Sequence, residues 1–518
     1  MELSAIIRNG AHKHPDRTAV RCGDQTQTYG QLHRRSLRLA NTLHALGVEP
    51  GERVATLGDN CLQSIEQMSG LALGGYVRSS LYTHNAAESN LYLLDLVEAS
   101  ALIVQRRHYD ALAPRLDEVG SLRHVLIFDG EAPDDAIGYE SALAQAPIDD
   151  PQVPLERDDP HIIRFSAGTT GKAKGILHTV SGWTSVGEEM MLAMPPQDAN
   201  DRYLAAGPLA HAAALPMWAT LAAGGSIVVM TAFDPERFVS LVEHERCTTT
   251  LLVPTMIQMV INHAGVAEAD LSSLRAVIYG AAPISERTLT DARALWGDVL
   301  YQMYGQSEAV PLTVLSPADH VGDDERGGRL RSAGRPTPHC TIRILDPDGN
   351  DLPPGQVGEI AAKTPAAMAA IWRDPQATAE RILADGSVLT RDMGYLDEDG
   401  YLFLADRKED MIISGGFNIW PAELENALAS HPAVAEVAVI GVAHEKWGET
   451  PKAVVVVRPG HHAGEQELID WTREKLGAVK RVTSVEFVDE LPKSPLGKVL
   501  RRAVRDRYRE VAAGVHGA

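Results

Sequence analysis

The sequence predicts an α/β protein with a large N-terminal domain of mostly parallel sheets and a small, mobile α+β C-terminal domain. The chain of 518 residues exceeds what one hydrophobic core usually serves, so we expect more than one domain. From Thr18 onward, short β-branched runs alternate with amphipathic helical stretches. This alternation is typical of parallel strands that are joined by crossover helices.

The apolar pattern predicts individual elements of the N-terminal domain. One helix carries Leu32, Leu39, Leu43 and Leu46 on one face and ends at Gly47. Continuous apolar runs predict strands that are covered on both faces. These runs are residues 101–104, 125–128, 227–230, 251–253 and 276–279.

From Thr341 the pattern changes to short apolar strands that are separated by turns. Two turns are predicted by an Asp-Pro-Asp-Gly sequence at 346–349 and an Asp-Glu-Asp-Gly sequence at 397–400. We therefore expect a β-rich subdomain within the N-terminal domain.

A new unit is predicted after the charged run at 406–410. Composition alone does not indicate a linker there, because the run contains neither proline nor glycine. The expected elements are a helix from Pro421, strands at 435–442 and 453–457, a helix at 465–476 and a strand at 484–488. We divide the chain into an N-terminal domain of residues 1–406 and a C-terminal domain of residues 407–518.

Composition excludes several classes of protein. The formal net charge of -21 argues against nucleic acid or an anionic membrane as the main partner, since both bind clustered basic faces. The cysteines Cys22, Cys61, Cys247 and Cys340 are far apart, which favours free thiols in a reducing compartment and no zinc site. The polar start of the chain and the lack of an apolar run near the ~20 residues that span a bilayer predict a soluble cytoplasmic protein without an integral membrane segment.

Residues 164–175 have the composition of an anion-binding loop. The segment holds three glycines, three hydroxyl side chains and two lysines. Glycine lets the backbone N–H groups approach an oxyanion closely, and the hydroxyl and ammonium groups add donors. The loop is not a Walker motif, because Ala173 follows Lys172 where Ser or Thr would be needed. A flexible surface turn is the alternative interpretation.

The segment from Ser166 to Gly175 resembles the phosphate-binding loop of the adenylate-forming superfamily, which includes acyl-CoA synthetases, luciferases and peptide-synthetase adenylation domains. The usual pattern has serine where Ala167 stands and proline where Ala173 stands. Further motifs follow in the family's order, so the resemblance covers almost the whole chain. They are Tyr-Gly-Gln-Ser-Glu at 304–308, Thr-Arg-Asp at 390–392, Asp-Arg-Lys-Glu-Asp at 406–410 and the segment 492–498.

The resemblance implies that the loop holds the β and γ phosphates of ATP. The candidate residues are Ser166, Gly168, Thr169, Thr170, Gly171, Lys172 and Lys174. Glu308 would bind a Mg²⁺ ion, since carboxylate oxygen suits this cation. Ser307, usually threonine, would place a hydroxyl near the phosphate or the acyl adenylate, beside Tyr304 and Gly305 of the nucleotide site. Without its motif, Glu308 would be interpreted as a solvated turn carboxylate.

Other nucleotide contacts are also implied by the resemblance. Asp392 would accept hydrogen bonds from the ribose hydroxyls, assisted by Arg407 from the domain joint. Gly280, Ala281 and Ala282 would line the adenine and acyl pocket, where small residues admit a flat ring. The simpler interpretations are a solvated acid in a hairpin and a glycine at a strand end that binds no ligand.

The C-terminal domain would supply a catalytic lysine and part of the coenzyme A tunnel. Lys498 resembles the lysine that reaches the substrate carboxylate and the α-phosphate, although a lysine near a chain end is usually solvated. Gly415 and Gly416 would line the pantetheine tunnel, and Glu409 stands at the hinge where the family usually has Asp or Lys. The usual proline near 480–481 is missing, so the contacts to the nucleotide of coenzyme A are left open.

His211 matches a family position beside the acyl carboxylate, although a lone histidine is more often structural. The alanines at 212–214 predict a roomy apolar wall, which favours a bulky or extended acyl group over acetate.

We interpret the chain as an ATP-dependent acid–CoA ligase that uses ATP, Mg²⁺ and coenzyme A on a small-molecule carboxylic acid. The candidate catalytic residues are Lys498, Lys174, Glu308 and His211. Three alternatives stay open: a freestanding adenylation enzyme that loads a carrier protein, a luciferase-like oxidase, and a catalytically silent nucleotide binder. The oligomeric state is not predicted, with a homodimer as one option, and neither is the identity of the acid.

Overall fold

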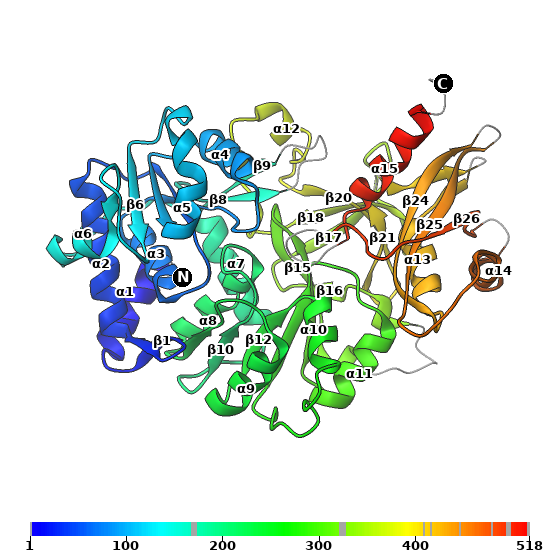
Figure 1. Cartoon of the computed structure of the whole chain (residues 1–518), viewed down its shortest axis with the longest axis horizontal. Helices are drawn as coiled ribbons and strands as arrows, with labels where there is room; N and C mark the ends of the chain where they lie inside the picture. The colour runs from blue at the N-terminus through cyan, green and yellow to red at the C-terminus, as the bar shows by residue number, and fades with distance from the viewer. Residues whose placement is uncertain are drawn as a thin grey trace.

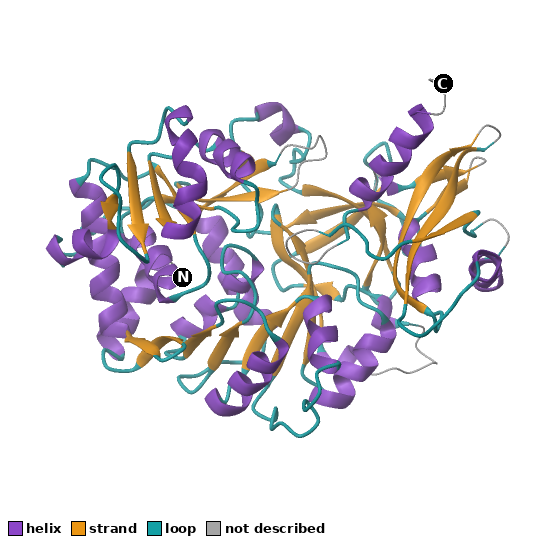
Figure 2. Ribbon diagram, viewed as in Figure 1, coloured by secondary structure: helices purple, strands orange, loops and turns teal. Residues whose placement is uncertain are grey.

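The computed structural model describes residues 3–166, 173–320, 328–407, 410–414, 417–444, 447–477, 480–493 and 499–514. The chain forms a large N-terminal body and a smaller C-terminal unit at one side of it (Figure 1). Helices lie against both faces of the two main sheets of the large body (Figure 2).

The first main sheet has the strand order β19-β9-β8-β4-β3-β5-β6-β7. Neighbours from β8 to β7 pair in parallel, whereas β9 and β19 extend the sheet in an antiparallel direction. The strands are β3 (Arg53–Leu57), β4 (Val77–Ser80), β5 (Ala101–Gln105), β6 (His124–Phe128), β7 (Ile137–Gly138), β8 (Pro160–Ser166), β9 (Lys174–Thr179) and β19 (Ala370–Ile371).

The second main sheet has the order β16-β15-β14-β13-β12-β10-β11-β1-β2, with a parallel centre and antiparallel ends. Its strands are β1 (Thr18–Cys22), β2 (Gln25–Thr28), β10 (Arg202–Ala205), β11 (Ser226–Val229), β12 (Thr249–Leu252), β13 (Ala276–Gly280), β14 (Leu300–Gln306), β15 (Ala309–Leu315) and β16 (Arg335–Pro336).

The helices of this body are α1 (Leu3–Lys13), α2 (Tyr29–Ala45), α3 (Leu62–Leu73), α4 (Ala87–Leu96), α5 (Arg106–Leu112), α6 (Tyr139–Gln145), α7 (Val180–Ala193), α8 (Met217–Ala222), α9 (Pro235–Glu245), α10 (Pro254–Ile261), α11 (Glu286–Trp296) and α12 (Pro375–Ala379). Short 3₁₀ turns lie at Ala113–Glu118, Ala212–Ala214, Pro317–His320 and Arg329–Arg331.

The main core lies between the two sheets. Ile162 of β8 packs in the same cluster as Tyr203 of β10 and Ile278 of β13, together with Leu32 of α2 and Trp183 of α7. The outer face of the second sheet is covered by α9, α10 and α11, and that of the first sheet by α4 and α5. Both faces of the central strands are therefore buried, which explains their continuous apolar sequences.

A separate antiparallel sheet follows, in the order β17-β18-β20-β21. Its strands are β17 (Thr341–Leu345), β18 (Gly358–Lys363), β20 (Val388–Leu396) and β21 (Leu402–Arg407). The predicted turns at 346–349 and 397–400 are confirmed, and each ends in a glycine with positive φ, Gly349 at 86° and Gly400 at 80°.

The C-terminal unit is a sheet in the order β23-β22-β25-β24, with β26 beside β25. Its elements are β22 (Ile412–Ser414), β23 (Phe417–Ile419), α13 (Pro421–Ala429), β24 (Val434–His444), β25 (Gly448–Val457), α14 (Glu465–Leu476), β26 (Ser484–Phe487) and α15 (Arg501–Gly514). One face of this sheet packs on α13 and α14. The other face packs on Leu491 and on Val504, which lies on α15. The predicted α+β unit is confirmed.

The predicted N-terminal elements are confirmed as well. The leucine-rich helix is α2, which begins with a capping box between Thr28 and Gln31 and is followed by Gly47 at φ 77°. The five predicted strands correspond to β5, β6, β11, β12 and β13.

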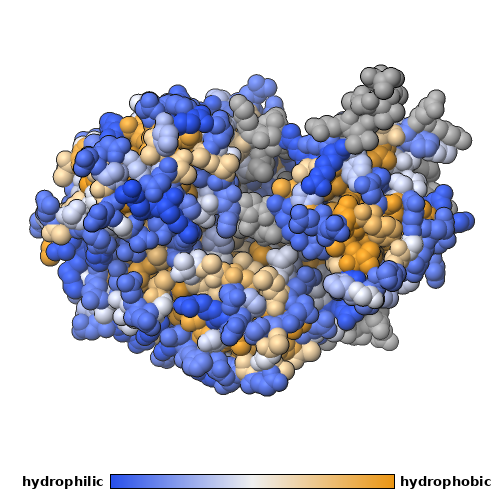
Figure 3. Space-filling view, in the orientation of Figure 1, coloured by the Kyte–Doolittle hydropathy of each residue, from blue (hydrophilic) through white to orange (hydrophobic). Residues whose placement is uncertain are grey.

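The visible surface is mostly hydrophilic, and apolar groups gather on the C-terminal side of the view (Figure 3). Within the described ranges, none of the helices combines the length and the apolar character that a membrane crossing requires.

Candidate active site

The predicted phosphate loop is the turn of a β-hairpin. Ser166 at the end of β8 pairs with Lys174 at the start of β9, so both residues lie at the base of the turn. The Nζ atom of Lys174 lies 3.5 Å from Oδ2 of Asp374, and both side chains are partly exposed. Gly168, Thr169, Thr170, Gly171 and Lys172 lie outside the described residues, so their predicted roles stay predictions.

Asp392 is held by the motif at 304–308. The hydroxyl group of Tyr304 donates a 2.7 Å hydrogen bond to Oδ2 of Asp392, and the side-chain amide of Gln306 donates to the same oxygen. The Gln306 amide also donates to the carbonyl oxygen of Thr390 at 2.8 Å. Asp392 pairs with Arg407 across β20 and β21, which places the backbone of the two predicted ribose contacts side by side. The side chain of Arg407 lies outside the described residues.

Glu308 is a buried and paired carboxylate rather than a solvated one. Its side chain is 10% exposed and lies 3.2 Å from the guanidinium of Arg381, which is itself 10% exposed. Arg381 also donates a 2.7 Å hydrogen bond to the carbonyl oxygen of Leu389, which fixes its position. The sequence analysis missed Arg381, because no motif surrounds it and its contact with Glu308 is made only by the fold.

Among the described residues, no group of three or more acidic, histidine or cysteine side chains could enclose a metal ion. Glu308 supplies a hard carboxylate oxygen at the site. Mg²⁺ in nucleotide enzymes is typically held by one or two carboxylates together with substrate phosphates. The donor set therefore fits a Mg²⁺ ion that arrives with the nucleotide, with Glu308 shared between the cation and Arg381.

Gly280 and Gly305 permit close backbone contacts at the carboxyl ends of β13 and β14. A Cβ atom on Gly280 would lie 2.2 Å from the carbonyl oxygen of Met303, and one on Gly305 would lie 2.8 Å from the Val310 side chain. Ala281 follows with φ at 67°, a left-handed conformation that is strained for a residue with a side chain. Ala281 and Ala282 thus leave the sheet at its carboxyl edge, where ligands of open parallel sheets bind.

His211 lies in the segment that leaves β10 at the same edge. Its ring centroid is 5.9 Å from that of Tyr82, whose hydroxyl group donates a 3.2 Å hydrogen bond to the carbonyl oxygen of Phe165. Burial, with the positive charge of Arg164 as the smaller cause, lowers the pKa of His211 to about 4. The imidazole is therefore neutral at neutral pH and adds no charge to the site.

The predicted alanine wall is only partly supported. Ala213 and Ala214 are each 2% exposed and pack into the core, so they line no open space. The carbonyl oxygen of Ala213 accepts a 2.7 Å hydrogen bond from the hydroxyl group of Tyr203, which fixes the turn in this orientation. Ala212 is the one of the three that remains partly exposed.

Ser307 is positioned through its backbone. Nε2 of His178 donates a 2.8 Å hydrogen bond to the carbonyl oxygen of Ser307. Because a carbonyl oxygen can only accept, the proton of the neutral imidazole is on Nε2. Burial, followed by repulsion from Arg164, lowers the pKa of His178 to about 3. His178 was not identified from the sequence, since it is one polar residue within an apolar strand.

Lys498, Gly415 and Gly416 lie outside the described residues, but the helix that follows Lys498 is anchored to the charged joint. Arg501 of α15 lies 3.3 Å from Oδ2 of Asp410, and Arg505 pairs with the same carboxylate. Arg501 also pairs with Glu425 of α13. The end of the 406–410 motif and the start of α15 are therefore connected by ion pairs.

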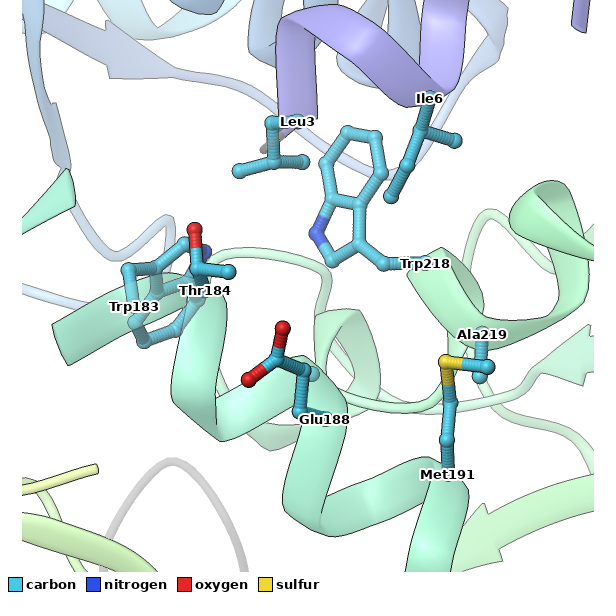
Figure 4. A pocket seen from close by; sticks show the side chains of 9 residues that line it. Leu3, Ile6, Trp183, Thr184, Glu188, Met191, Trp218 and Ala219 are labelled. Atoms are coloured by element: carbon cyan, nitrogen blue, oxygen red, sulfur yellow. The ribbon is translucent and has the colours of Figure 1, made fainter. Parts of the chain in front are cut away.

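A small, mainly apolar surface hollow opens between α1, α7 and α8 (Figure 4). Trp183, Met191 and Trp218 are among its lining residues, and the Trp218 ring lies between Leu3 and Ile6. The Trp183 ring is also 5.6 Å from the guanidinium carbon of Arg164. Trp183 thus borders both this hollow and the hairpin that carries the predicted phosphate loop.

The comparison with known proteins agrees with this geometry. The sequence model of the family described as AMP-binding enzyme matches residues 7–372, and that of the AMP-binding enzyme C-terminal domain matches residues 423–498. The chain belongs to the AMP-binding enzyme family, which is a family of ATP-dependent, AMP-forming ligases. The resemblance to the adenylate-forming superfamily is thereby confirmed.

Similar proteins carry out related reactions. The chain is 38% identical over 502 residues to a feruloyl-CoA synthase from Amycolatopsis sp, covering 96% of this chain and 97% of that protein. It is 35% identical over 507 residues to a fatty acid–[acyl-carrier-protein] ligase from Streptomyces coeruleorubidus, covering 96% and 95%. Among solved structures, an amide bond synthetase from Marinactinospora thermotolerans is 30% identical, with a TM-score of 0.88 over 98% of this chain and 100% of that one.

Proposed function

We propose that the protein activates a carboxylic acid with ATP and transfers the acyl group to coenzyme A. In the first step a carboxylate oxygen attacks the α-phosphorus of ATP, and the bond to the β-phosphate oxygen breaks to release pyrophosphate. In the second step the thiol sulfur attacks the acyl carbon and AMP leaves. The observation that carries this proposal is the junction of the motifs at 304–308 and 390–392, where the hydroxyl group of Tyr304 donates a hydrogen bond to Asp392 and Arg381 contacts both Gln306 and Glu308.

The nucleotide contacts follow from this arrangement. Asp392 is a hydrogen-bond acceptor held in place by Tyr304 and Gln306, which suits a ribose diol. Gly280 and the residues after it would face the adenine ring. The loop between Ser166 and Lys174 would hold the phosphates, since its N–H groups and ammonium groups are donors for oxyanions.

Mg²⁺ bound with the nucleotide would neutralise charge on the phosphate oxygens. Glu308 would hold it, while Arg381 keeps the carboxylate oriented through their 3.2 Å ion pair. Because positioning and charge neutralisation supply most of the rate enhancement in such displacements, the fixed position of Glu308 matters more than its basicity.

The two steps would alternate between two positions of the C-terminal domain. We place the boundary at 406–407, with residues 1–406 and 407–518 as the moving bodies and the 406–410 run as hinge. Asp410 supports this location, because its ion pairs with Arg501 and Arg505 couple the hinge to the helix that follows Lys498. A hinge movement would carry Lys498 to the carboxylate for the first step and Gly415 and Gly416 to the pantetheine arm for the second.

The acyl group is expected to be bulky or extended. The partly exposed Ala212, which follows His211 in the chain, provides apolar surface there. The relatives that act on ferulate and on indoleacetate support a ring-bearing acid as the first class to test. His211 would separate the reacting carboxylate from this apolar region.

A panel of acids tests the proposal. Ferulate, indole-3-acetate and decanoate are each incubated with the enzyme, ATP and Mg²⁺, with and without coenzyme A, and pyrophosphate, AMP and acyl-CoA are measured. We expect acid-dependent pyrophosphate release and, with coenzyme A, acyl-CoA in equal amount to AMP. Pyrophosphate release with transfer only to a phosphopantetheinyl carrier protein would instead favour a carrier-loading enzyme, and no acid-dependent release would contradict both.

A further inference from the structure

Two arginine side chains, buried Arg78 and half-buried Arg164, lie on adjacent strands of the first main sheet. Arg78 is on β4 and is 8% exposed, and Arg164 is on the neighbouring strand β8. Arg78 pairs with Ile162 in the parallel register, so Arg164 lies two residues further along on the same face of the sheet. The Nη1 atom of each arginine is buried and has no hydrogen-bond partner. In the part of the chain that the structure describes, neither guanidinium forms an ion pair with a carboxylate.

Such an arrangement is destabilising unless something compensates it, because a buried charge without a partner keeps its full desolvation cost. The surrounding side chains compensate it only in part. The Trp183 ring lies against the Arg164 guanidinium at 5.6 Å, and the remaining neighbours include His161 and His178. Burial lowers the pKa of His161 to about 4, with Arg78 as the second cause, so these histidines are neutral at pH 7. Among the described residues, no ion pair at bonding distance neutralises the positive charge of the two guanidinium groups.

This positive charge acts on the residues proposed for the reaction. Arg164 is the second cause that lowers the pKa of His211, and the negative charge of Glu308 acts in turn on the pKa of Arg164. Arg164 lies two residues before Ser166 on β8, so the two side chains point to the same face of the sheet, close to the start of the phosphate loop. Tyr82 and His211 lie close to the same strand: the hydroxyl group of Tyr82 donates a hydrogen bond to the carbonyl oxygen of Phe165, the residue after Arg164, and the Tyr82 ring lies 5.9 Å from that of His211.

An anion that enters this region would be a carboxylate rather than a phosphate. The phosphate loop has its own donors in sequence after Ser166, whereas the groups around Arg164 are aromatic: the Trp183 ring lies 5.6 Å from its guanidinium carbon, and Tyr82, which contacts His211, donates a hydrogen bond to the backbone of the next residue. Aromatic walls with one charged group suit an organic acid. The acid must also approach Glu308, whose negative charge repels it, and a buried guanidinium offsets that repulsion.

We propose that Arg164 binds the carboxylate of the acid substrate and positions it for attack on ATP, with Arg78 behind it maintaining the positive potential. This inference rests on the proposed acid-activating function. The inference is that Arg164 contacts the carboxylate of the acid and makes no contact with the nucleotide. Loss of the guanidinium should therefore weaken acid binding selectively, which a purely structural role of Arg164 would not do.

The test uses acid-dependent ATP–pyrophosphate exchange with whichever acid of ferulate, indole-3-acetate and decanoate gives the fastest rate. Arg164→Gln is expected to raise the KM for the acid by about tenfold or more, which is the loss of one hydrogen bond to a charged group, and to leave the KM for ATP within about twofold. Arg164→Lys keeps the charge and is expected to be intermediate. Arg335→Gln is the matched control, because the Arg335 guanidinium also lies on an aromatic ring, 4.3 Å from that of Tyr401, on strand β16.

An unchanged KM for the acid in Arg164→Gln, or an equal rise in both KM values, would overturn the inference while leaving the proposed function intact. A wild-type enzyme that is inactive on the whole panel would contradict both. A second measurement needs no variant: the carboxamide of the chosen acid should compete with it at least about tenfold more weakly than a carboxylate of the same shape. Equal competition by the carboxamide would also overturn the inference.

Discussion

The hydroxyl group of Tyr304 donates a 2.7 Å hydrogen bond to Oδ2 of Asp392 and thereby joins two motifs that lie 88 residues apart in the chain. One motif ends β14 and the other lies within β20 of the antiparallel sheet. The proposed ribose site therefore depends on the packing of two different sheets. A residue that only holds Asp392 should then affect nucleotide binding without contacting the nucleotide itself.

Tyr304→Phe is expected to raise the KM for ATP by about tenfold, because a hydrogen bond to a charged group contributes about 1.5 to 3 kcal/mol. Gln306 still donates to Asp392 in this variant, so the loss should be partial. Pyrophosphate exchange at varied ATP concentration measures the effect. Tyr301→Phe is the control on the same strand. A Tyr304→Phe enzyme with the KM of the wild type would show that Asp392 does not need this donor.

Substitutions of Glu308 and of Arg381 should have different effects on the Mg²⁺ dependence of the rate and on the melting temperature. Glu308→Gln is expected to slow adenylation by about 10² to 10³, by analogy with loss of one group that stabilises transition-state charge, and to raise the Mg²⁺ concentration needed for half-maximal rate. Arg381→Gln should lower the melting temperature, since it leaves the buried Glu308 carboxylate without its partner, and should raise the Mg²⁺ requirement less than Glu308→Gln does, because the carboxylate ligand is still present. Equal Mg²⁺ requirements in both variants would contradict the role of Glu308 as metal ligand.

Buried histidines should make stability depend on pH. The pKa of His178 is lowered from 6.5 to about 3 in the folded protein, mainly by burial. The unfolded chain therefore binds a proton between pH 6.5 and 3 that the folded chain does not, so stability is full above about pH 6.5 and falls as the pH falls. At pH 5 this histidine alone should cost about 2 kcal/mol.

Thermal unfolding at pH 7.5, 6.0 and 5.0 measures this dependence. His178→Gln keeps an amide donor for the Ser307 carbonyl but cannot titrate, so its melting temperature should fall less between pH 7.5 and 5.0 than that of the wild type. His244→Gln, at an exposed position of α9, is the control. A His178→Gln protein with the pH dependence of the wild type would rule out this histidine as a cause.

The sequence could predict the central strands β5, β6, β11, β12 and β13 because their runs are short, apolar and continuous, as expected for strands covered on both faces. It could also point to Glu308 and Asp392 as candidates, but only through the motifs, since both look like ordinary turn and hairpin acids by themselves. The structure adds what local sequence does not contain. Arg381 is found only because the fold brings it to Glu308.

Polar residues within apolar strands were the main omission. Arg78 lies on β4 and Arg164 on β8, and neither strand was among those predicted, because polar residues interrupt the apolar pattern of both. The alanine run at 212–214 was predicted to form a pocket wall, but small apolar residues occur equally in pocket walls and in tightly packed turns. Ala213 and Ala214 proved to be core residues.

Lys498 provides the test of domain alternation. If its ammonium group stabilises charge on the carboxylate and the α-phosphate, Lys498→Ala should slow adenylation by about 10² to 10³, equivalent to about 2.7 to 4 kcal/mol. Transfer from supplied acyl adenylate to coenzyme A should be much less affected, because the C-terminal domain would have moved this lysine away. Lys493→Ala is the control. Lys493 lies on the same segment as Lys498 and pairs at 2.6 Å with Glu436 of β24, so this variant is expected to leave the rates of both steps unchanged. Single-turnover rates of each step measure the division, and an equal loss in both steps would show that Lys498 acts through the stability of its domain.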